Sequence, residues 1–276
     1  MLDRTKVSVN LKTAEEIDAM RVAGRLASEL LDYLTPHVLP GVTTREINDL
    51  AHDYMVNVQR TVPATLNYTP PGHSPYPASL CTSVNHVVCH GIPGDKKLKD
   101  GDIVNIDVTV IVDGWHGDTS RMYAIGPNVP RKAQRLMDIT YEAMMRGINA
   151  IKPGATLGDL GHAIQSFAEA ERTSVVREFC GHGLGRVFHD APNVLHFGKP
   201  GQGDVLKPGM IFTVEPMLNA GAPAVKVLND GWTAVTKDKS LSSQYEHSVG
   251  VTEDGVVIFT KSPAGLDQPH KLNATA

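Results

Sequence analysis

Two motifs occur twice along the chain in the same order, and this repetition strongly limits how the chain can fold. Pro-Gly-Val-Thr at positions 40–43 and Pro-Gly-Ala-Thr at 153–156 each stand before a helical pattern. Further along, the run 98–107 matches the run 206–215, and each run ends in a carboxylate. One such match would be ordinary loop chemistry, because Pro-Gly turns are common. Two matches in one order instead predict a duplicated unit of helices followed by strands.

Local patterns predict a mixed α+β fold. Helical periodicity and capping residues predict helices at about 14–33, 43–56, 130–149 and 156–171. Runs rich in β-branched residues predict strands at about 79–88, 103–112, 115–125, 175–179, 210–216, 224–227, 244–252 and 256–260. Residues 61–79 are rich in Pro, Gly and Tyr and are predicted to form a long loop.

The composition indicates a globular protein with no membrane or direct nucleic-acid role. Of the 276 residues, 41% are hydrophobic and 20% are charged, and the formal net charge is −4. No long block of Lys and Arg is present to attract nucleic acid or an anionic membrane, and no apolar run is long enough to span a bilayer. The N-terminal residues lack the apolar core of a signal peptide. Three cysteines cannot all pair, which favours reduced thiols and a cytoplasmic location.

Asp107 and Asp118 are predicted to lie close together on one sheet face. Asp113-Gly114 separates two alternating runs, which is a strong signal for a two-residue hairpin loop. With that loop, Asp107 and Asp118 become diagonal neighbours about 7–8 Å apart. Carboxylates at this spacing repel each other, so that one takes up a proton or a cation lies between them. The other explanation, two solvated carboxylates, fits poorly with the apolar run 104–111 around Asp107.

A glycine-rich segment, 180–189, supplies two further candidates. His182 lies between two glycines, and His189 follows at the end of the segment. Glycines permit the close backbone approach that a site built from backbone and imidazole needs. Most histidines in a chain are ordinary surface or core residues, but one histidine between two glycines with another seven residues later favours a functional site. The segment is not a phosphate loop, because it lacks Gly-Lys-Ser/Thr and does not open a helix.

Three more residues become candidates through their positions. Glu215 stands before a proline at a predicted strand end, and Glu246 alternates with Gln244 and Ser248. His90 lies at a junction between a strand and a loop. Each glutamate alone would more often be an ordinary surface residue, and His90 alone favours neither reading.

The candidates acquire a chemical meaning as a set. Four carboxylates and one imidazole are offered by Asp107, Asp118, His182, Glu215 and Glu246. Oxygen ligands with a single nitrogen suit Co, Mn, Fe(II) or Zn, and the lack of cysteine ligands argues against a structural zinc site. Four negative charges balance two divalent cations, which is an arrangement used for metal-assisted hydrolysis.

Five strings of residues carry a family resemblance. They are Asn-Ile-Asp-Val-Thr at 105–109, His-Gly-Asp-Thr-Ser-Arg at 116–121, Gly-His-Gly-Leu-Gly at 181–185, Thr-Val-Glu-Pro at 213–216 and Gln-Tyr-Glu-His at 244–247. Together they resemble the bacterial-type (type I) methionine aminopeptidases, from about Lys12 to Pro263. The resemblance implies the pita-bread fold, in which two pseudo-twofold-related α+β halves share a central antiparallel sheet covered by helices. The whole chain 1–276 would form one catalytic domain, with halves at about 13–125 and 126–262 and a short polar tail.

The resemblance assigns a role to each predicted ligand. Asp107 would chelate one metal ion, and Asp118 and Glu246 would bridge both ions. His182 and Glu215 would complete the second site. A hydroxide shared by the ions would attack the carbonyl of the N-terminal methionine.

Other residues are implied in the chemistry around the metals. His189 would polarise the scissile carbonyl and stabilise the developing oxyanion. His90 would contact the scissile amide, and Glu215 would also relay protons. Thr109 would support one of the metal ligands.

Two binding sites are implied beside the metals. The pocket for the methionine side chain would be lined by Tyr68, Tyr76, Cys81, Phe188 and Trp232. A weaker correspondence places a monovalent cation at Asn85, Val87 and Ser242. The chain departs from the family pattern at Thr65, where Cys is frequent, and at 69–75, a segment several residues longer than usual.

The same resemblance sets the expected partners and the competing functions. We expect a cytoplasmic monomer that acts on the N-termini of nascent polypeptides, a role that allows contact with the ribosome. Prolidases and Xaa-Pro aminopeptidases share the fold and the metals but usually carry a large extra N-terminal domain. Some pita-bread proteins are non-catalytic binding modules that have lost the ligands. Type II methionine aminopeptidases carry a long insertion between the positions of His182 and Glu246, which is absent here.

Overall fold

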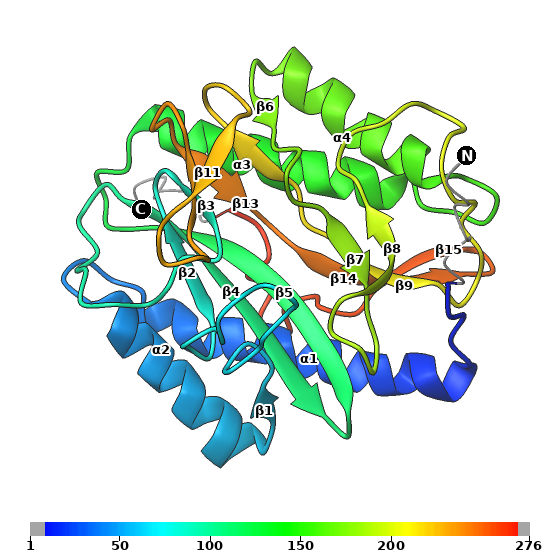
Figure 1. The fold of residues 1–276 in the computed structure, drawn as a ribbon, viewed down its shortest axis with the longest axis horizontal. Coiled ribbons are helices and arrows are strands. Elements are labelled where there is room, and N and C mark those ends of the chain that lie inside the picture. Colours follow the sequence, from blue (N-terminus) through cyan, green and yellow to red (C-terminus); the bar gives the residue numbers. More distant parts are fainter. Residues whose placement is uncertain (1–8, 270–276) are drawn as a thin grey trace.

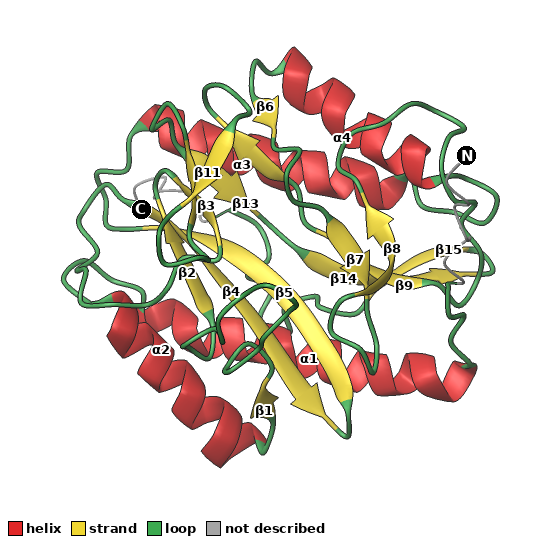
Figure 2. Cartoon of the chain, in the orientation of Figure 1, coloured by secondary structure: helices red, strands yellow, loops and turns green. Residues whose placement is uncertain are grey.

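Two pairs of helices lie on opposite sides of the molecule with the strands between them (Figures 1 and 2). The computed structural model describes residues 9–269. Helices α1 (Ala14–Leu34) and α2 (Thr44–Asp53) lie on one side, and α3 (Arg131–Asn149) and α4 (Leu157–Ala170) on the other. Within residues 9–269, no helix is long and apolar enough to cross a membrane.

The first two helices begin where their capping residues predict. Thr13 caps α1 and Thr43 caps α2, each in a reciprocal capping box with a glutamate three residues later. Helix α1 runs into a 3₁₀ turn, η1 (Thr35–His37), and α2 into a π-helical turn, η2 (Tyr54–Gln59). Apolar periodicity does not predict such a π-turn, because it marks the helix face and not the hydrogen-bond spacing.

The N-terminal strands form one antiparallel sheet around β4 (Ile103–Val112). Strand β5 (Trp115–Ala124) pairs along one edge of β4. The short strands β1 (Val62–Pro63) and β2 (Cys81–Val84) share its other edge. Buried side chains from α1 and α2 pack against these strands and form one of the two main apolar cores.

The C-terminal strands form the second large sheet, which packs against α3 and α4. Its strand order is β15 (Gly255–Ile258), β14 (His247–Thr252), β9 (Ile211–Val214), β7 (Gly181–Gly183) and β8 (Asp190–Val194). One smaller sheet contains β13 (Ser242–Gln244), β10 (Met217–Asn219) and β6 (Ser174–Val175). Another contains β11 (Val225–Val227), β12 (Ala234–Thr236) and β3 (Val87–Cys89), and therefore joins segments far apart in the sequence.

The two copies of the Pro-Gly motif form the same hydrogen bonds. In each copy the glycine N–H donates to a leucine carbonyl just before a later strand, at 2.8 Å and 3.0 Å. That leucine N–H donates back to the residue after the glycine, at 2.8 Å in both copies. The residues are Gly41, Leu98 and Val42 in the first copy and Gly154, Leu206 and Ala155 in the second. Both glycines have positive φ, 92° and 85°, so the predicted repeat of this motif is confirmed.

The hairpin between β4 and β5 has the predicted register. Val112 pairs with Trp115, and Thr109 pairs with Asp118. The two loop residues, Asp113-Gly114, both have positive φ, as a type I′ turn requires. Asp107 and Asp118 are therefore diagonal neighbours on one face, as the hairpin predicted.

Several strand predictions were wrong in detail. The strand predicted at 79–88 is two strands, because Asn85 takes a left-handed φ of 57° between β2 and β3. The strand predicted at 244–252 breaks at Tyr245 and Glu246, and β13 and β14 join different sheets. Only Ser174–Val175 is a strand where 175–179 was predicted. Strands β1, β7, β8, β10 and β12, each of five residues or fewer, were missed.

Candidate metal centre

The hairpin β4–β5 contributes two carboxylates to the centre. Asp107 and Asp118 face one side, while the neighbouring Ile106 and Val108 are buried in the core on the other side. Thr109 lies opposite Asp118 and donates its hydroxyl to Asp118 Oδ1 at 2.8 Å. The position of the Asp118 carboxylate is therefore fixed by the strand pairing and by this hydrogen bond.

Strands β7 and β9 place His182 beside Glu215. A Cβ atom at Gly181 would lie 2.4 Å from the Thr213 carbonyl oxygen, and one at Gly183 would lie 1.9 Å from a carbonyl oxygen of β8. Only glycine allows these backbones to approach so closely. The Thr213 hydroxyl accepts the His182 N–H at 3.0 Å and donates to Glu215 Oε1 at 2.7 Å. One threonine thus links two of the predicted ligands.

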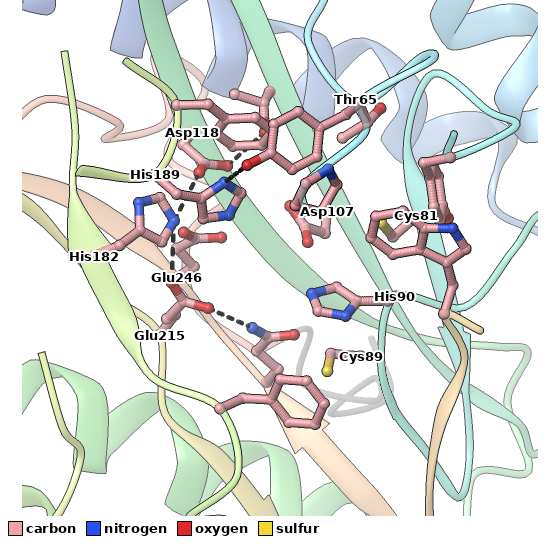
Figure 3. Close-up of a pocket in the computed structure, with 18 of the residues that line it drawn as sticks. Thr65, Cys81, Cys89, His90, Asp107, Asp118, His182, His189, Glu215 and Glu246 are labelled. Carbon is pink, nitrogen blue, oxygen red and sulfur yellow. Dashed lines mark hydrogen bonds and ion pairs between the residues drawn. The ribbon is translucent and has the colours of Figure 1, made fainter. Parts of the chain in front are cut away.

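Glu246 enters the centre from the break between β13 and β14. The nearest ligand atoms of Asp118, His182 and Glu246 all lie within 4.8 Å of one another. His182 Nε2 lies 3.5 Å from Asp118 Oδ2 and 3.6 Å from Glu215 Oε1. Figure 3 shows these side chains together with Asp107 around one space. The structure therefore brings all five predicted ligands together.

Burial and like charges control the protonation of this cluster. Burial, then the charge of Asp118, raises the pKa of Asp107 well above its ordinary value. The pKa of Glu246 is raised in the same way. Burial raises the pKa of Glu215 to about 7, although His182 acts in the opposite direction. Burial alone would lower the pKa of His182, but its hydrogen bond to Asp118 and the charge of Glu215 raise it to about 9.

This arrangement fits divalent cations. The five residues line a cavity of about 410 Å³, and no Lys or Arg is among its described lining residues. Carboxylates that repel one another without a permanent positive charge nearby are stabilised by bound cations. The donor set of carboxylate oxygens and one imidazole suits transition-metal ions, and four carboxylates match the charge of two of them.

Two further histidines face the same cavity. His189 Nδ1 lies 2.8 Å from Tyr68 Oη, and its ring centroid lies 4.2 Å from that of His182. The His90 ring packs edge-on against Phe179 at 5.3 Å. Burial lowers the pKa of His189 to about 3 and that of His90 to about 4. Both imidazoles are therefore neutral near pH 7, with one donor and one acceptor nitrogen each.

The predicted apolar pocket opens beside the carboxylates. Its members Tyr68, Tyr76, Cys81, Phe188 and Trp232 all line the cavity. The Tyr68 ring lies 5.0 Å from Phe188, and the Tyr76 ring lies 5.2 Å from Trp232 in an edge-on contact. Thr65 lines the same cavity and donates its hydroxyl to a backbone carbonyl at 3.0 Å. The aromatic walls suit a long apolar side chain.

The long segment 69–75 forms part of the rim of this pocket. Trp232 Nε1 donates to the Ser74 carbonyl oxygen at 3.0 Å. His73 lies 4.9 Å from the Trp232 ring and also lines the cavity. The C-terminal end of the segment is thus held on Trp232, a residue of the pocket itself.

Sequence reasoning missed three residues of the centre or gave them no role. Gln244 Nε2 donates to Glu215 Oε2 at 3.2 Å, and the buried His196 Nε2 accepts the Glu215 backbone N–H at 3.1 Å. Phe179 lines the cavity. The alternation with Glu246 could have identified Gln244 as a neighbour of the site. No local pattern distinguishes His196 or Phe179.

The three residues matched to a monovalent-cation site lie in neighbouring segments. Ser242 N–H donates to the Asn85 carbonyl oxygen at 2.8 Å. Asn85 has a left-handed φ of 57°, and Val87 begins β3 two residues later. The structure therefore brings Asn85 and Ser242 into direct contact.

Comparison with known proteins determines the family. Residues 18–253 match the model of metallopeptidase family M24. The chain belongs to metallopeptidase family M24. Within this family, it is 56% identical over 264 residues to the methionine aminopeptidase of Rickettsia prowazekii (strain Madrid E), covering 95% of this chain and 99% of that protein.

Solved structures of M24 proteins agree with this assignment. The crystal structure of the methionine aminopeptidase from Rickettsia prowazekii has a TM-score of 0.88 and covers 92% of this chain and 100% of that chain. The methionine aminopeptidase from Thermotoga maritima has a TM-score of 0.87 at 36% identity, covering 92% and 99%. The prolidase from Pyrococcus horikoshii OT3 shares only the fold, with a TM-score of 0.71 at 20% identity, and just 63% of it is covered against 91% of this chain. The predicted pita-bread fold is confirmed.

Proposed function

We propose that this M24 metallopeptidase is a methionine aminopeptidase, which hydrolyses the peptide bond after an N-terminal methionine. The observation that carries the proposal is one cavity in which five metal-binding side chains adjoin an aromatic, apolar pocket. Relatives named for this activity match nearly the whole chain at more than 50% sequence identity. A non-catalytic module would have no need of the full ligand set. The prolidase alternative rests on likeness of fold alone.

We infer that Asp107, Asp118, His182, Glu215 and Glu246 hold two divalent ions. Asp118 and Glu246 would hold both ions, Asp107 would hold one of them, and His182 and Glu215 would hold the other. Co, Mn, Fe(II) and Zn all suit this donor set. When bound, the ions act as Lewis acids and activate water for attack on the scissile carbonyl.

The neutral histidines complete the chemistry around the scissile bond. His189 Nδ1 is engaged by Tyr68 at 2.8 Å, which leaves Nε2 for the substrate. With Tyr68 as the donor, Nε2 carries the proton and donates to the carbonyl oxygen as negative charge develops there. His90 contacts the scissile amide. Glu215 would accept a proton from the activated water and return it to the leaving amine.

The pocket explains selection of the first residue. Tyr76, Cys81, Phe188 and Trp232 surround an apolar space that suits the methionine thioether and excludes charged side chains. The second side chain of the substrate would lie close to the metals, where a bulky group would clash. We therefore expect Gly, Ala or Ser at the second position, and rejection of Leu or Lys.

Three tripeptides test this proposal. The purified, metal-loaded enzyme is given Met-Ala-Ser, Met-Leu-Ser and Leu-Ala-Ser separately, and kcat/KM is measured for each. We expect efficient release of methionine from Met-Ala-Ser alone. Steric exclusion of a bulky side chain should change the discrimination between substrates by more than the ~1–3 kcal/mol that one methylene contributes. Efficient cleavage of Met-Leu-Ser or Leu-Ala-Ser would instead identify a broader aminopeptidase.

The cellular role follows from the same activity. We propose that the substrates are the N-termini of nascent polypeptides, a role that allows contact with the ribosome, and that the enzyme is a cytoplasmic monomer. Three free cysteines are consistent with a reducing compartment. One catalytic domain comprises both halves of the chain, with the boundary near residue 125. Asn85, Val87 and Ser242 are the proposed site of a monovalent cation.

A further inference from the structure

The two halves of the molecule meet beside the proposed metal ligands. Strand β5 carries Asp118 and belongs to the N-terminal sheet, whereas β14 follows Glu246 and belongs to the C-terminal sheet. Between them, the described residues form only an isolated bridge, Ser120 with Glu246, in which Glu246 N–H donates to Ser120 O at 3.2 Å. No continuous ladder of backbone hydrogen bonds fixes the spacing of these two strands.

Two hydroxyl groups bridge this junction reciprocally. Thr119 in β5 donates its Oγ1 hydrogen to the Glu246 carbonyl oxygen at 2.7 Å. Ser248 in β14 donates its Oγ hydrogen to the Asp118 carbonyl oxygen at 2.5 Å. Both hydroxyl-bearing residues are buried, with exposed fractions of 2% and 0%. Each strand therefore binds the backbone of the carboxylate residue that the other half contributes.

A third side chain strengthens the same junction. Asn105 Nδ2 donates to the Gln244 carbonyl oxygen at 2.8 Å and to Ser120 Oγ at 3.0 Å. All these bonds are shielded from water, where losing a partner leaves a buried polar group unpaired. Their combined effect is to hold Asp118 and Glu246 in a fixed relation, although the two residues come from different sheets.

We propose that Thr119 and Ser248 are positioning residues that set the separation of the Asp118 and Glu246 carboxylates, and thereby the affinity of the centre for divalent ions. Neither side chain lines the cavity, so both act only through the residues whose carbonyl groups they bind. Asp118 and Glu246 are the two ligands proposed to bridge the ions, so their spacing affects both ions. This inference rests on the proposed metal site.

The chain supplies matched controls for testing the two hydroxyls. Thr82 Oγ1 and Ser243 Oγ are also buried but have no hydrogen-bond partner. Thr119→Val is therefore compared with Thr82→Val, and Ser248→Ala with Ser243→Ala. Each pair removes the same atoms from a buried site, and only the first member of each pair removes a bond across the junction.

Binding of Mn²⁺ to metal-stripped protein is measured by isothermal titration calorimetry for the native chain and all four variants. We expect Thr119→Val and Ser248→Ala to bind Mn²⁺ about 10–100-fold more weakly than the native chain, as for other groups that orient metal ligands. The two control variants should bind as the native chain does. Thr119→Ser keeps the hydroxyl and should restore most of the affinity.

The outcomes separate this inference from the proposed metal site. If the native chain itself fails to bind Mn²⁺ or any of the other candidate ions, the metal site is wrong. If the native chain binds but the junction variants bind as tightly as their controls, the positioning role is wrong. Thermal unfolding of the metal-free variants measures whether a substitution damages the fold as a whole. A fall in affinity matched by an equal fall in the control variants would also contradict the inference, because it would reflect general damage to the core.

Discussion

Buried like charges dominate the chemistry of individual residues at the centre. Asp118 contributes to the raised pKa values of both Asp107 and Glu246, and it also lies next to His182. The hydroxyl of Thr109 holds the Asp118 carboxylate from the other side. Asp118 thus affects the protonation of every other ligand. The effects of single substitutions should therefore appear first in metal binding.

Proton release on metal binding is the first prediction at this scale. Metal ligands must be deprotonated, and the pKa values of Glu215 (about 7) and His182 (about 9) place protons on the cluster near neutral pH. Divalent ions should therefore bind more tightly as the pH rises through this range and should displace protons at pH 7. Calorimetric titrations in two buffers of different ionisation enthalpy count the released protons. Identical heats in both buffers would show that the ligands are already deprotonated.

His189 supplies the second prediction at the residue scale. If it stabilises the oxyanion and does not bind metal, His189→Ala should keep its metal content and lose about 10²–10³-fold in kcat. Metal analysis and steady-state kinetics on the same preparation test both parts. Loss of an ion from the variant would make His189 a metal ligand and contradict the assigned role.

At the scale of elements, local sequence patterns correctly predicted the features that local interactions determine. The capping residues Thr13 and Thr43 and the Asp113-Gly114 turn fixed two helix starts and the register of the main hairpin. The short strands carry no such signal, because they form only when distant segments pair. For the same reason, no local pattern could show that His182 and Glu246 meet Asp118, and the family resemblance supplied that contact.

Two residues that contact Glu215 were given no role from the sequence. His196 is buried, and within the described residues its side chain forms one hydrogen bond, in which it accepts the Glu215 backbone N–H. Gln244 contacts the same glutamate through its side chain. Both contacts depend on how separate strands pack, which the order of residues along the chain does not reveal.

The rim segment 69–75 gives a prediction at the element scale. Trp232→Phe keeps an aromatic ring in the pocket but removes the Nε1–H that holds Ser74. Loss of one hydrogen bond, about 1 kcal/mol, should raise KM for Met-Ala-Ser about fivefold, with a smaller effect on kcat. Trp115→Phe, at a buried tryptophan outside the cavity, is the control. An unchanged KM would mean that the segment does not shape the pocket.

At the scale of the whole molecule, a buried ionic network fastens the C-terminal segment to the N-terminal half. Arg121 in β5 lies 3.0 Å from Asp32 of α1 and 3.8 Å from Asp267. Ser262 donates its hydroxyl to Asp32 at 2.7 Å. The charged groups are largely shielded from water, so each one depends on its oppositely charged partner for stabilisation.

This network leads to a prediction about stability. Arg121→Met leaves two shielded carboxylates without their cation and should lower the free energy of unfolding by about 3–5 kcal/mol. Arg135→Met breaks an exposed pair with Glu171 and should cost only about 0–1 kcal/mol. Urea unfolding followed by circular dichroism compares the two variants. Equal effects would show that the Arg121 network adds no more than a surface ion pair.

The two halves of the molecule face each other across one cavity, and each half supplies part of the proposed metal site. Asp107 and Asp118 come from the N-terminal sheet, whereas His182, Glu215 and Glu246 come from the C-terminal part of the chain. Neither half alone offers the four carboxylates that balance two divalent ions. The proposed function therefore depends on the assembled molecule and on the cations that its two halves would hold together.

Restoring metal to stripped protein tests this dependence most directly. The chelated enzyme is titrated with Mn²⁺, Co²⁺, Fe²⁺ or Zn²⁺, and methionine release from Met-Ala-Ser is measured at each step against the bound metal. We predict no release from the metal-free protein and a return of activity as the ions bind. Full activity of protein shown to contain no metal would contradict the metal-dependent mechanism.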